Sequence, residues 1–216
     1  MKLVVEPIIN LLHEASYSTL ATQSAQLPGY PYATVVPNVL DASHRPLLLV
    51  SALAEHTKNL LADHQVSLSL LEPGTTKVQA AARITLLGDA EQFEPDELLT
   101  ARYLRYLPDA VQYLELDFMF FRVNPKRVRF IAGVGKMGWL EAAQWAAVPS
   151  LSLDREGALV EIAQRAAPSG IRILGVDVYG IDYEADGFRD RQALDGHAAQ
   201  VDLDEEYLRR VASQLS

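Results

Sequence analysis

The chain has 216 residues, of which 49% are apolar and 22% charged, and this composition predicts a globular protein of one large domain or two modest ones. It carries 28 acidic and 19 basic residues, and the net charge of −9, with no basic run, argues against nucleic acid or an anionic membrane as a partner. The sequence has no cysteine, which excludes disulfides, thiolate metal sites and cysteine nucleophiles and agrees with a reducing, cytoplasmic location.

The first residues begin like a secretion signal, but Glu6 and Pro7 interrupt the apolar run, so we interpret them as part of the mature protein. No apolar stretch approaches the ~20 residues that a membrane-spanning helix needs. The apolar residues after Pro7 recur at helical spacing and predict a short amphipathic helix. They are Ile8, Leu11, Leu12 and Ala15.

After this helix, short β-branched or alternating runs separated by Pro, Gly, Asp and Asn predict strands. The five runs cover residues 17–22, 32–40, 47–51, 65–71 and 78–87. In the fourth run, Val66, Leu68 and Leu70 alternate with serines, which indicates a sheet with one buried face. One helix, at 54–63, is expected between the third and fourth runs.

Helical periodicity returns at 97–107, and a second short helix is expected from Leu107 to about Leu114. Two further strands are predicted at 117–123 and 127–132, with Asn124-Pro125-Lys126 as the turn between them. The regular helical crossovers of a parallel sheet are missing. We therefore predict an α+β fold built on an antiparallel split β-barrel of six to seven strands with flanking helices.

The rest of the chain predicts a smaller unit. We assign residues 1–140 to the barrel domain, 136–152 to a connector and 151–216 to a small C-terminal α+β module. In the module, a helical stripe over 159–166 precedes a β-prone run over 171–179, Asp186-Gly187 predicts a hairpin turn, and the last helix is expected to begin at Asp202. Such a small module is marginal alone, so we expect it to dock on the barrel or on a second copy.

Residues 133–138 form the pattern G-x-G-x-x-G after a predicted strand, as in a dinucleotide-binding fingerprint. The preceding strand carries Lys126, Arg127 and Arg129, whereas the first strand of a doubly wound sheet is continuously apolar. We therefore favour a glycine loop at the end of a barrel strand over a Rossmann site.

At Ser51-Ala52-Leu53-Ala54-Glu55-His56-Thr57-Lys58-Asn59-Leu60, an apolar strand ends and a helix begins. Free amides at the helix start, together with the side chains of residues 56–59, offer many donors and suit a phosphate group. The alternative is an ordinary solvated first turn, and an inward-pointing Glu55 carboxylate would argue against an anion.

The histidines contain no pair at i+4 and no His/carboxylate spacing typical of a metal site, so no metal is expected. They are His13, His44, His56, His64 and His197. No hydrolase elbow or nucleotide triphosphatase loop occurs either, and no catalytic residue can be singled out.

Several blocks together resemble the FMN-binding split-barrel proteins of the pyridoxamine phosphate oxidase-like superfamily, particularly the haem-utilisation branch that appends a small C-terminal α+β module. The blocks are Tyr17–Thr22, Pro31–Val36, Ser51–Leu60, Ala82–Gly88 and residues 117–135. The most specific of them is S-x-L-A-x-H-T-x-N-L around His56. The resemblance covers residues 10–140 well and 151–216 more weakly.

This resemblance implies a homodimer of split barrels with FMN in each of two clefts at the subunit interface. It places the flavin phosphate near His56, Thr57, Lys58 and Asn59, with Ser51 at the end of the preceding strand closing the site. It also implies that Arg83 is a further partner of the phosphate. By the same resemblance, the isoalloxazine ring is lined by the backbone of Thr34, Val35 and Val36. In such a protein the flavin carries the electrons, which agrees with the lack of an obvious catalytic acid or base. FMN and deazaflavin remain open.

The chain also departs from the family pattern. The arginine-bearing C-terminal segment of pyridoxamine phosphate oxidising members is missing, so that activity is not expected. The haem-utilisation branch often has Met-Asn-x-Asp-His where this chain has Arg155-Glu156-Gly157-Ala158-Leu159-Val160-Glu161, which puts haem binding by analogy in doubt. His197, in a predicted turn, is a candidate axial ligand.

The function that follows is an FMN-dependent oxidoreductase that passes electrons from reduced flavin to a small flat or aromatic substrate, with haem or a related tetrapyrrole as the specific candidate. The alternative is a non-catalytic flavin- or tetrapyrrole-binding sensor or carrier.

Overall fold

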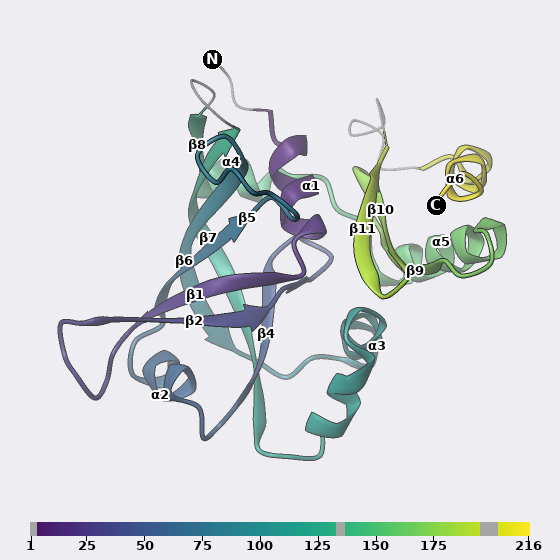
Figure 1. Cartoon of the computed structure of the whole chain (residues 1–216). Helices are drawn as coiled ribbons and strands as arrows, with labels where there is room; N and C mark the ends of the chain where they lie inside the picture. The colour runs from purple at the N-terminus through teal and green to yellow at the C-terminus, as the bar shows by residue number, and fades with distance from the viewer. Residues whose placement is uncertain (1–3, 133–136, 195–202) are drawn as a thin grey trace.

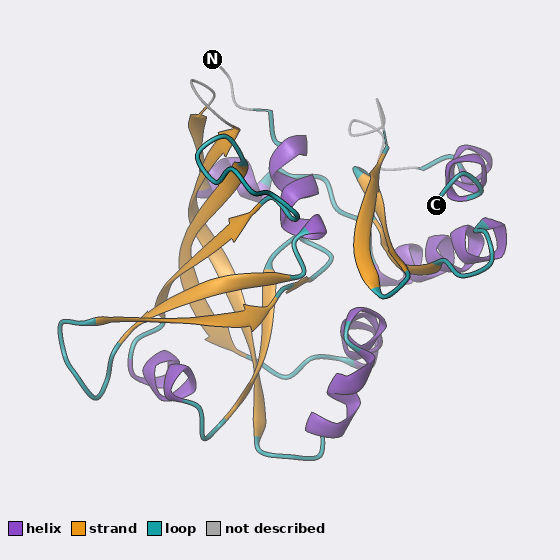
Figure 2. Cartoon of the chain, viewed as in Figure 1, coloured by secondary structure: helices purple, strands orange, loops and turns teal. Residues whose placement is uncertain are grey.

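The computed structural model describes residues 4–132, 137–194 and 203–216. Within these ranges, an antiparallel eight-stranded sheet curls into a half-barrel, and a three-stranded antiparallel sheet with two helices lies beside it (Figures 1 and 2). The predicted α+β fold with a split barrel, flanking helices and a C-terminal α+β module is confirmed.

The large sheet has the strand order β2-β1-β5-β6-β7-β4-β3, and β8 also pairs with β7. Its strands are β1 (Tyr17–Gln23), β2 (Pro31–Pro37), β3 (Val39–Leu40), β4 (Pro46–Ser51), β5 (Gln65–Leu71), β6 (Ala82–Gln92), β7 (Phe118–Ala132) and β8 (Met137–Glu141). In β5, Val66, Leu68 and Leu70 are buried as the alternation predicts. The barrel core is therefore built from one face of each strand.

The prediction of two strands joined by a turn at residues 124–126 is wrong, because β7 runs through this segment without a break. The register with β6 shifts here: Leu87 pairs with Arg127 and Gly88 with Pro125, so that Lys126 is an extra residue. A β-bulge tolerates proline within a strand. Gly88 allows the close approach, since a Cβ at this position would lie 2.6 Å from the Asn124 carbonyl oxygen.

Two other strand predictions need correction. The expected run over 32–40 is divided into β2 and β3 at Asn38, whose buried amide donates hydrogen bonds to the carbonyls of Leu12 and Ala15. The run over 78–87 begins only at Ala82, because the residues before it form a turn whose carbonyls accept hydrogen bonds from the Arg83 guanidinium.

The helices of the barrel part are α1 (Glu6–Glu14), α2 (Glu55–Ala62), α3 (Glu97–Tyr106) and α4 (Ala142–Ala146), and Pro108–Tyr113 is a 3-10 helix. The first three and the short helix near 108 are confirmed. The predicted connector over 136–152 is wrong in its first half, which forms β8 and α4. There, Leu140 is buried, and the Arg127 guanidinium carbon lies 4.1 Å from the centroid of the Trp139 ring.

The C-terminal segment contains α5 (Leu153–Ala166), β9 (Arg172–Val176), β10 (Gly180–Ala185), β11 (Phe188–Ala193) and α6 (Glu205–Ala212). The Asp186-Gly187 turn is confirmed, and both residues have positive φ, 51° and 81°, as a two-residue hairpin turn requires. The last helix begins later than predicted, because Asp204 caps it by accepting from the amides of Glu206 and Tyr207. Asp202 lies outside the described residues.

Helix α1 lies between the half-barrel and the three-stranded sheet, and α3 lies under β9 (Figure 1). One continuous apolar cluster runs from α1 and the barrel strands into β9, β10, α5 and α6. The carboxyl end of α1 therefore stands where the barrel meets the C-terminal segment. No described helix combines the length and apolar character needed to cross a bilayer.

Candidate functional site

The junction between β4 and α2 carries the residues that the sequence singles out for phosphate binding. Ser51 is the last residue of β4, and its hydroxyl accepts a 3.3 Å hydrogen bond from the Leu53 amide. Ala54 caps α2 without a side-chain acceptor. The first amides of α2 consequently have no side-chain cap and are oriented as donors at a helix N-terminus.

Thr57 and Asn59 are fully buried and hold this junction together. The Thr57 hydroxyl donates to the Ser51 carbonyl at 2.6 Å. The Asn59 side chain donates to the Thr22 hydroxyl at 2.9 Å and accepts from the Ala25 amide at 2.8 Å. Both side chains therefore fix α2 to β4 and to the β1–β2 connection.

The side chains left for a ligand are those of Ser51, His56 and Lys58. Lys58 is half exposed, and its ammonium lies 3.9 Å from the Glu55 carboxylate. Burial lowers the pKa of the half-buried His56 imidazole. Glu55 Oε2 accepts a 2.9 Å hydrogen bond from Gln26 of the β1–β2 connection, whereas Glu55 Oε1 is buried without a hydrogen-bond partner. An ammonium, a hydroxyl and uncapped amides at one helix start fit a phosphate group.

The structure places the other predicted cofactor residues on β2 and β6. Thr34, Val35 and Val36 lie on β2, an edge strand that α2 contacts; Val35 is 64% exposed and Val36 is buried. Arg83 is not brought to the β4–α2 junction of its own chain. It pairs with Ile131 near the end of β7, whereas Ser51 pairs with Phe118 at the start of that fifteen-residue strand.

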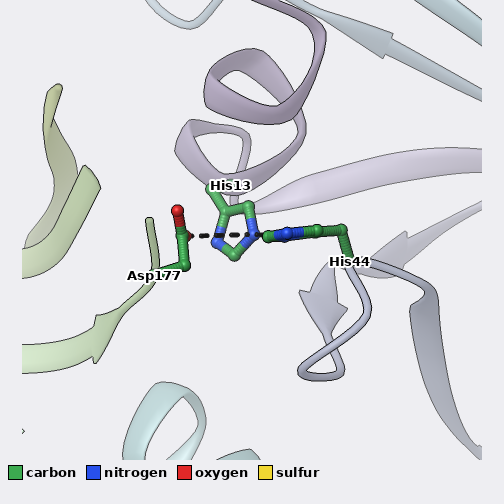
Figure 3. Close-up of side chains that lie close together, drawn as sticks. All are labelled: His13, His44 and Asp177. Carbon is green, nitrogen blue, oxygen red and sulfur yellow. Dashed lines mark hydrogen bonds and ion pairs between the residues drawn. The ribbon is translucent and has the colours of Figure 1, made fainter. Parts of the chain in front are cut away.

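A second polar cluster, which the sequence analysis missed, lies where the barrel meets the C-terminal segment. His13 comes from the last turn of α1, His44 from the loop before β4 and Asp177 from the loop after β9, and all three are buried (Figure 3). His13 Nε2 lies 2.9 Å from His44 Nδ1 and 3.5 Å from Asp177 Oδ2. We call these residues, with Asp182 and Arg191, the histidine–aspartate cluster.

Asp182 and Arg191 complete the cluster. His13 Nδ1 lies 2.7 Å from Asp182 Oδ2, and the Arg191 guanidinium pairs with both Asp177 and Asp182. Burial acts to raise the pKa of Asp177, but Arg191 and the two histidines outweigh it and lower this pKa to about 2. Arg191 and His13 likewise lower the pKa of Asp182, against the opposing effect of burial. Both carboxyl groups are therefore ionised inside the protein.

A cavity of about 10 Å³, enough for about one water molecule, adjoins the cluster. Its lining includes His13, His44 and Asp177 and extends to Asp41 and Glu156. Local motif searches could not find this cluster, because its two histidines are 31 residues apart and its carboxylates come from another part of the chain. The expectation of no metal site rested only on spacing along the sequence.

Two sequence-based features fall outside the described residues. His197, the candidate axial ligand, lies between residues 195 and 202, and the first four positions of the G-x-G-x-x-G pattern lie at 133–136. The positions that flank this pattern belong to β7 and β8, which pair antiparallel. A parallel β-α-β unit is therefore not formed by the described residues around it.

Comparisons with curated proteins find relatives named for haem chemistry. The chain is 37% identical over 132 residues to the chloroplastic non-canonical heme oxygenase HOZ of Arabidopsis thaliana, a match that covers 60% of this chain and 40% of the relative. It is 32% identical over 127 residues to the heme oxygenase HutZ of Vibrio cholerae, covering 54% of this chain and 69% of that protein. The chain thus spans less than half of the plant protein.

Solved structures agree with this fold. A heme binding protein from Mycobacterium smegmatis matches over 100% of both chains with a TM-score of 0.61 and 26% identity. The protein Atu2129 from Agrobacterium tumefaciens, described as of unknown function, matches 98% of this chain and 94% of its own with a TM-score of 0.74 and 23% identity, which shows the shared fold.

The family model described as pyridoxamine 5'-phosphate oxidase matches residues 6–132, which hold α1, most of the half-barrel and the whole β4–α2 junction. This match spans more than half of the chain. The chain belongs to the pyridoxamine 5'-phosphate oxidase family of split-barrel proteins.

Proposed function

We propose that this protein binds FMN at the β4–α2 junction and passes electrons from the reduced flavin to a flat tetrapyrrole of the haem class. The observation that carries the proposal is a set of hydrogen-bond donors suited to a phosphate group at an uncapped helix start. This junction lies inside residues 6–132, which the family model matches. The haem part is supported by the names of the two curated relatives, which share 37% and 32% identity with this chain.

The residues of the junction would divide the work of holding the cofactor. Lys58, Ser51, His56 and the first amides of α2 would contact the flavin phosphate. Thr57 and Asn59 would act as positioning residues, because their side chains are committed to the protein. When bound, FMN would supply the electron-transfer chemistry, and the protein would supply position and polarity. The backbone of β2 at residues 34–36 would lie along the isoalloxazine.

The proposal includes a homodimer in which each cofactor site draws on both subunits. Arg83 lies at the far end of β7 from Ser51, so an Arg83 contact to the same phosphate would have to come from the second copy. Exposed apolar side chains on and beside the β1–β2 edge hairpin offer surface for pairing. They are Tyr17, Leu27, Tyr30 and Val35.

The phosphate assignment is tested with Lys58→Ala, followed by FMN titration through quenching of flavin fluorescence. Loss of one charge-assisted hydrogen bond is worth about 1.5–3 kcal/mol, so we expect FMN affinity to fall roughly tenfold to a hundredfold. Lys126→Ala, at another lysine that is well exposed and paired with a carboxylate, is the control and should change nothing. Riboflavin, which lacks the phosphate, should bind both variants alike. Unchanged FMN affinity in Lys58→Ala would show that the assignment is wrong.

The proposal that both subunits contribute to each site is tested by mixing two variants that are each expected to bind FMN weakly. Lys58→Ala and Arg83→Ala homodimers should each bind FMN weakly. A heterodimer of the two would contain one intact site and one doubly altered site, so that tight binding should return at half the wild-type stoichiometry. If Arg83→Ala homodimers bound FMN normally, Arg83 would not be part of the site. A monomeric mass in light scattering would contradict the proposed dimer.

The electron-transfer step is tested in two stages. Desalted protein incubated with FMN and haemin should retain a flavin band and a Soret band. The loaded protein should then consume a nicotinamide donor continuously, and tetrapyrrole absorbance should change only when FMN and donor are both present. Retention of haemin without this turnover would contradict the enzymatic proposal.

A second candidate function is a non-catalytic flavin or tetrapyrrole carrier or sensor. The observation that favours it is the full-length match to the structure named as a heme binding protein from Mycobacterium smegmatis. Stoichiometric binding with no donor consumption, in the same assay, is the result expected of a carrier.

A further inference from the structure

We propose that the histidine–aspartate cluster is a metal site in which His13 Nε2, His44 Nδ1 and Asp177 Oδ2 hold one divalent transition-metal ion of the zinc class. The three ligand atoms all lie within 4.8 Å of one another and all three residues are buried (Figure 3). This site is separate from the β4–α2 junction and does not depend on the function proposed above.

The first argument is the direction of the two imidazole rings. His13 Nδ1 faces the Asp182 carboxylate at 2.7 Å, and His44 Nε2 faces the Pro149 carbonyl at 3.2 Å. Both of these partners are acceptors, so both outer nitrogens carry the ring hydrogen. Metal-binding histidines are oriented in this way by a carboxylate or a backbone carbonyl on the far nitrogen.

The second argument follows from the inner nitrogens. When the ring hydrogens are on His13 Nδ1 and His44 Nε2, the other two nitrogens, His13 Nε2 and His44 Nδ1, point lone pairs at each other across 2.9 Å. Only a cation, either a proton or a metal ion, can stabilise two facing lone pairs. The carboxylates of Asp177 and Asp182 outnumber the single Arg191 guanidinium that pairs with them, which leaves one net negative charge beside the histidines.

The third argument is that more than two ligands converge. Tetrahedral coordination with bonds of 2.0–2.1 Å separates ligand atoms by about 3.3 Å. The separations from His13 Nε2 are 2.9 Å to His44 Nδ1 and 3.5 Å to Asp177 Oδ2, on either side of that value. The adjoining cavity of about 10 Å³ has room for one water as a fourth ligand. Two imidazoles and one carboxylate are a donor set that zinc-class ions prefer over magnesium or calcium.

The backbone at His44 gives independent support. His44 has a φ of +61°, in the left-handed region that is uncommon for residues other than glycine, although asparagine, aspartate and histidine adopt it more often than most. The turn is fixed by Asp41, whose carboxylate accepts from the amides of Ser43 and Arg45. An uncommon backbone conformation that is held by its surroundings and aims a side chain at a polar cluster is often found at functional sites.

The ion would connect three segments that are far apart in the sequence. His13 and His44 belong to the barrel part, and Asp177 belongs to the C-terminal segment. A bound ion would therefore fasten the C-terminal segment to the barrel, and it would stabilise the folded chain by mass action.

The test uses the full-length protein, stripped of metal with a chelator and titrated with Co²⁺. We expect one equivalent to bind with the intense visible bands of low-coordinate cobalt, Zn²⁺ to displace it, and the melting temperature to rise on Zn²⁺ addition. Less than a tenth of an equivalent bound, with no visible bands and no melting shift, would overturn the proposal and leave a shared proton between the histidines. This result does not depend on any variant.

Two variants locate the ion. His44→Asn removes the imidazole but suits the positive φ, so it should fold and bind Co²⁺ at least tenfold more weakly. His64→Asn, at an exposed histidine 3.8 Å from the Asp89 carboxylate, is the matched control and should bind as the wild type does. Full cobalt affinity in His44→Asn, or its loss in His64→Asn, would overturn the assignment.

Discussion

At the scale of single residues, buried charges in this protein are paired across the boundary between its two parts. Arg102 of α3 and Glu156 of α5 are 3% and 2% exposed and form an ion pair, to which Arg105 adds a 2.9 Å contact. Arg102 also donates to the Leu40 carbonyl. Such a pair is costly to break, because the remaining charge stays in a site with little access to water.

We expect Glu156→Gln to lower the free energy of unfolding by about 3 kcal/mol or more, because it leaves Arg102 buried without a carboxylate. Glu161→Gln is the matched control on the same helix. Its carboxylate is 70% exposed and pairs with Arg165, so the expected change is within about 0.5 kcal/mol. Urea denaturation followed by circular dichroism measures both. Equal effects of the two substitutions would mean that burial does not govern these pairs.

A second residue-scale contact joins Tyr106 to the histidine–aspartate cluster. The buried Tyr106 hydroxyl donates to Asp182 Oδ2 at 2.6 Å, and burial raises the pKa of this tyrosine, so it stays protonated. Gly175 makes room for this hydroxyl, since a Cβ there would lie 2.1 Å from it.

We expect Tyr106→Phe to lower the free energy of unfolding by about 1.5–3 kcal/mol, the range for a hydrogen bond to a charged partner. Tyr113→Phe, at a tyrosine that is 36% exposed and stacks on Phe118, should have little effect. Chemical denaturation compares the two variants. A Tyr106→Phe protein as stable as the wild type would show that another group satisfies the Asp182 carboxylate.

At the scale of elements, two glycines illustrate opposite uses of the same residue. Gly157 lies inside α5, where nothing within 4 Å would meet an added Cβ. Gly187 occupies the β10–β11 turn with a φ of +81°. Glycine therefore costs stability in the helix and supplies a needed conformation in the turn.

We expect Gly157→Ala to stabilise the protein by about 0.5–1 kcal/mol, the difference in helix propensity. Gly187→Ala should destabilise it by about 1 kcal/mol or more, since an alanine has a strained backbone at this φ. Thermal denaturation of the two variants and the wild type shows whether each substitution raises or lowers the melting temperature. Shifts of the same sign would contradict this account of the two elements.

At the scale of the whole molecule, the barrel and the C-terminal segment are joined through buried contacts rather than through a flexible hinge. One apolar cluster includes Ile8 and Leu20 from the barrel part and Ile173 and Leu208 from the C-terminal part. The ion pair between α3 and α5 and the histidine–aspartate cluster cross the same boundary. The two predicted units, 1–140 and 151–216, therefore share their core.

We expect the full chain to unfold in one cooperative transition. Tryptophan fluorescence, which reports on β8 and α4 through Trp139 and Trp145, should follow the same melting curve as far-UV circular dichroism. The calorimetric and van't Hoff enthalpies should agree. Two separate transitions would show that the C-terminal module folds independently of the barrel.

The sequence by itself determined the class of the fold and the strand-to-helix junction at which we propose the cofactor site. Alternating burial in β5, the helical stripe of α1 and the Asp186-Gly187 turn are local patterns, and each formed as predicted. The β4–α2 junction is also local, because a strand end and a helix start follow within four residues of each other. Periodicity and turn chemistry depend on neighbours along the chain, so one sequence suffices to find them.

Only the tertiary structure decided the rest. It made β7 continuous through Pro125, because a bulge at Lys126 of β7, opposite Leu87 and Gly88 of β6, accommodates the proline. It committed the Thr57 and Asn59 side chains to contacts within the protein. It also brought His13 to Asp182, 169 residues away along the chain. Contacts between distant segments depend on how whole elements pack, and burial then fixes the charge and orientation of groups that carry no signal in their own neighbourhood.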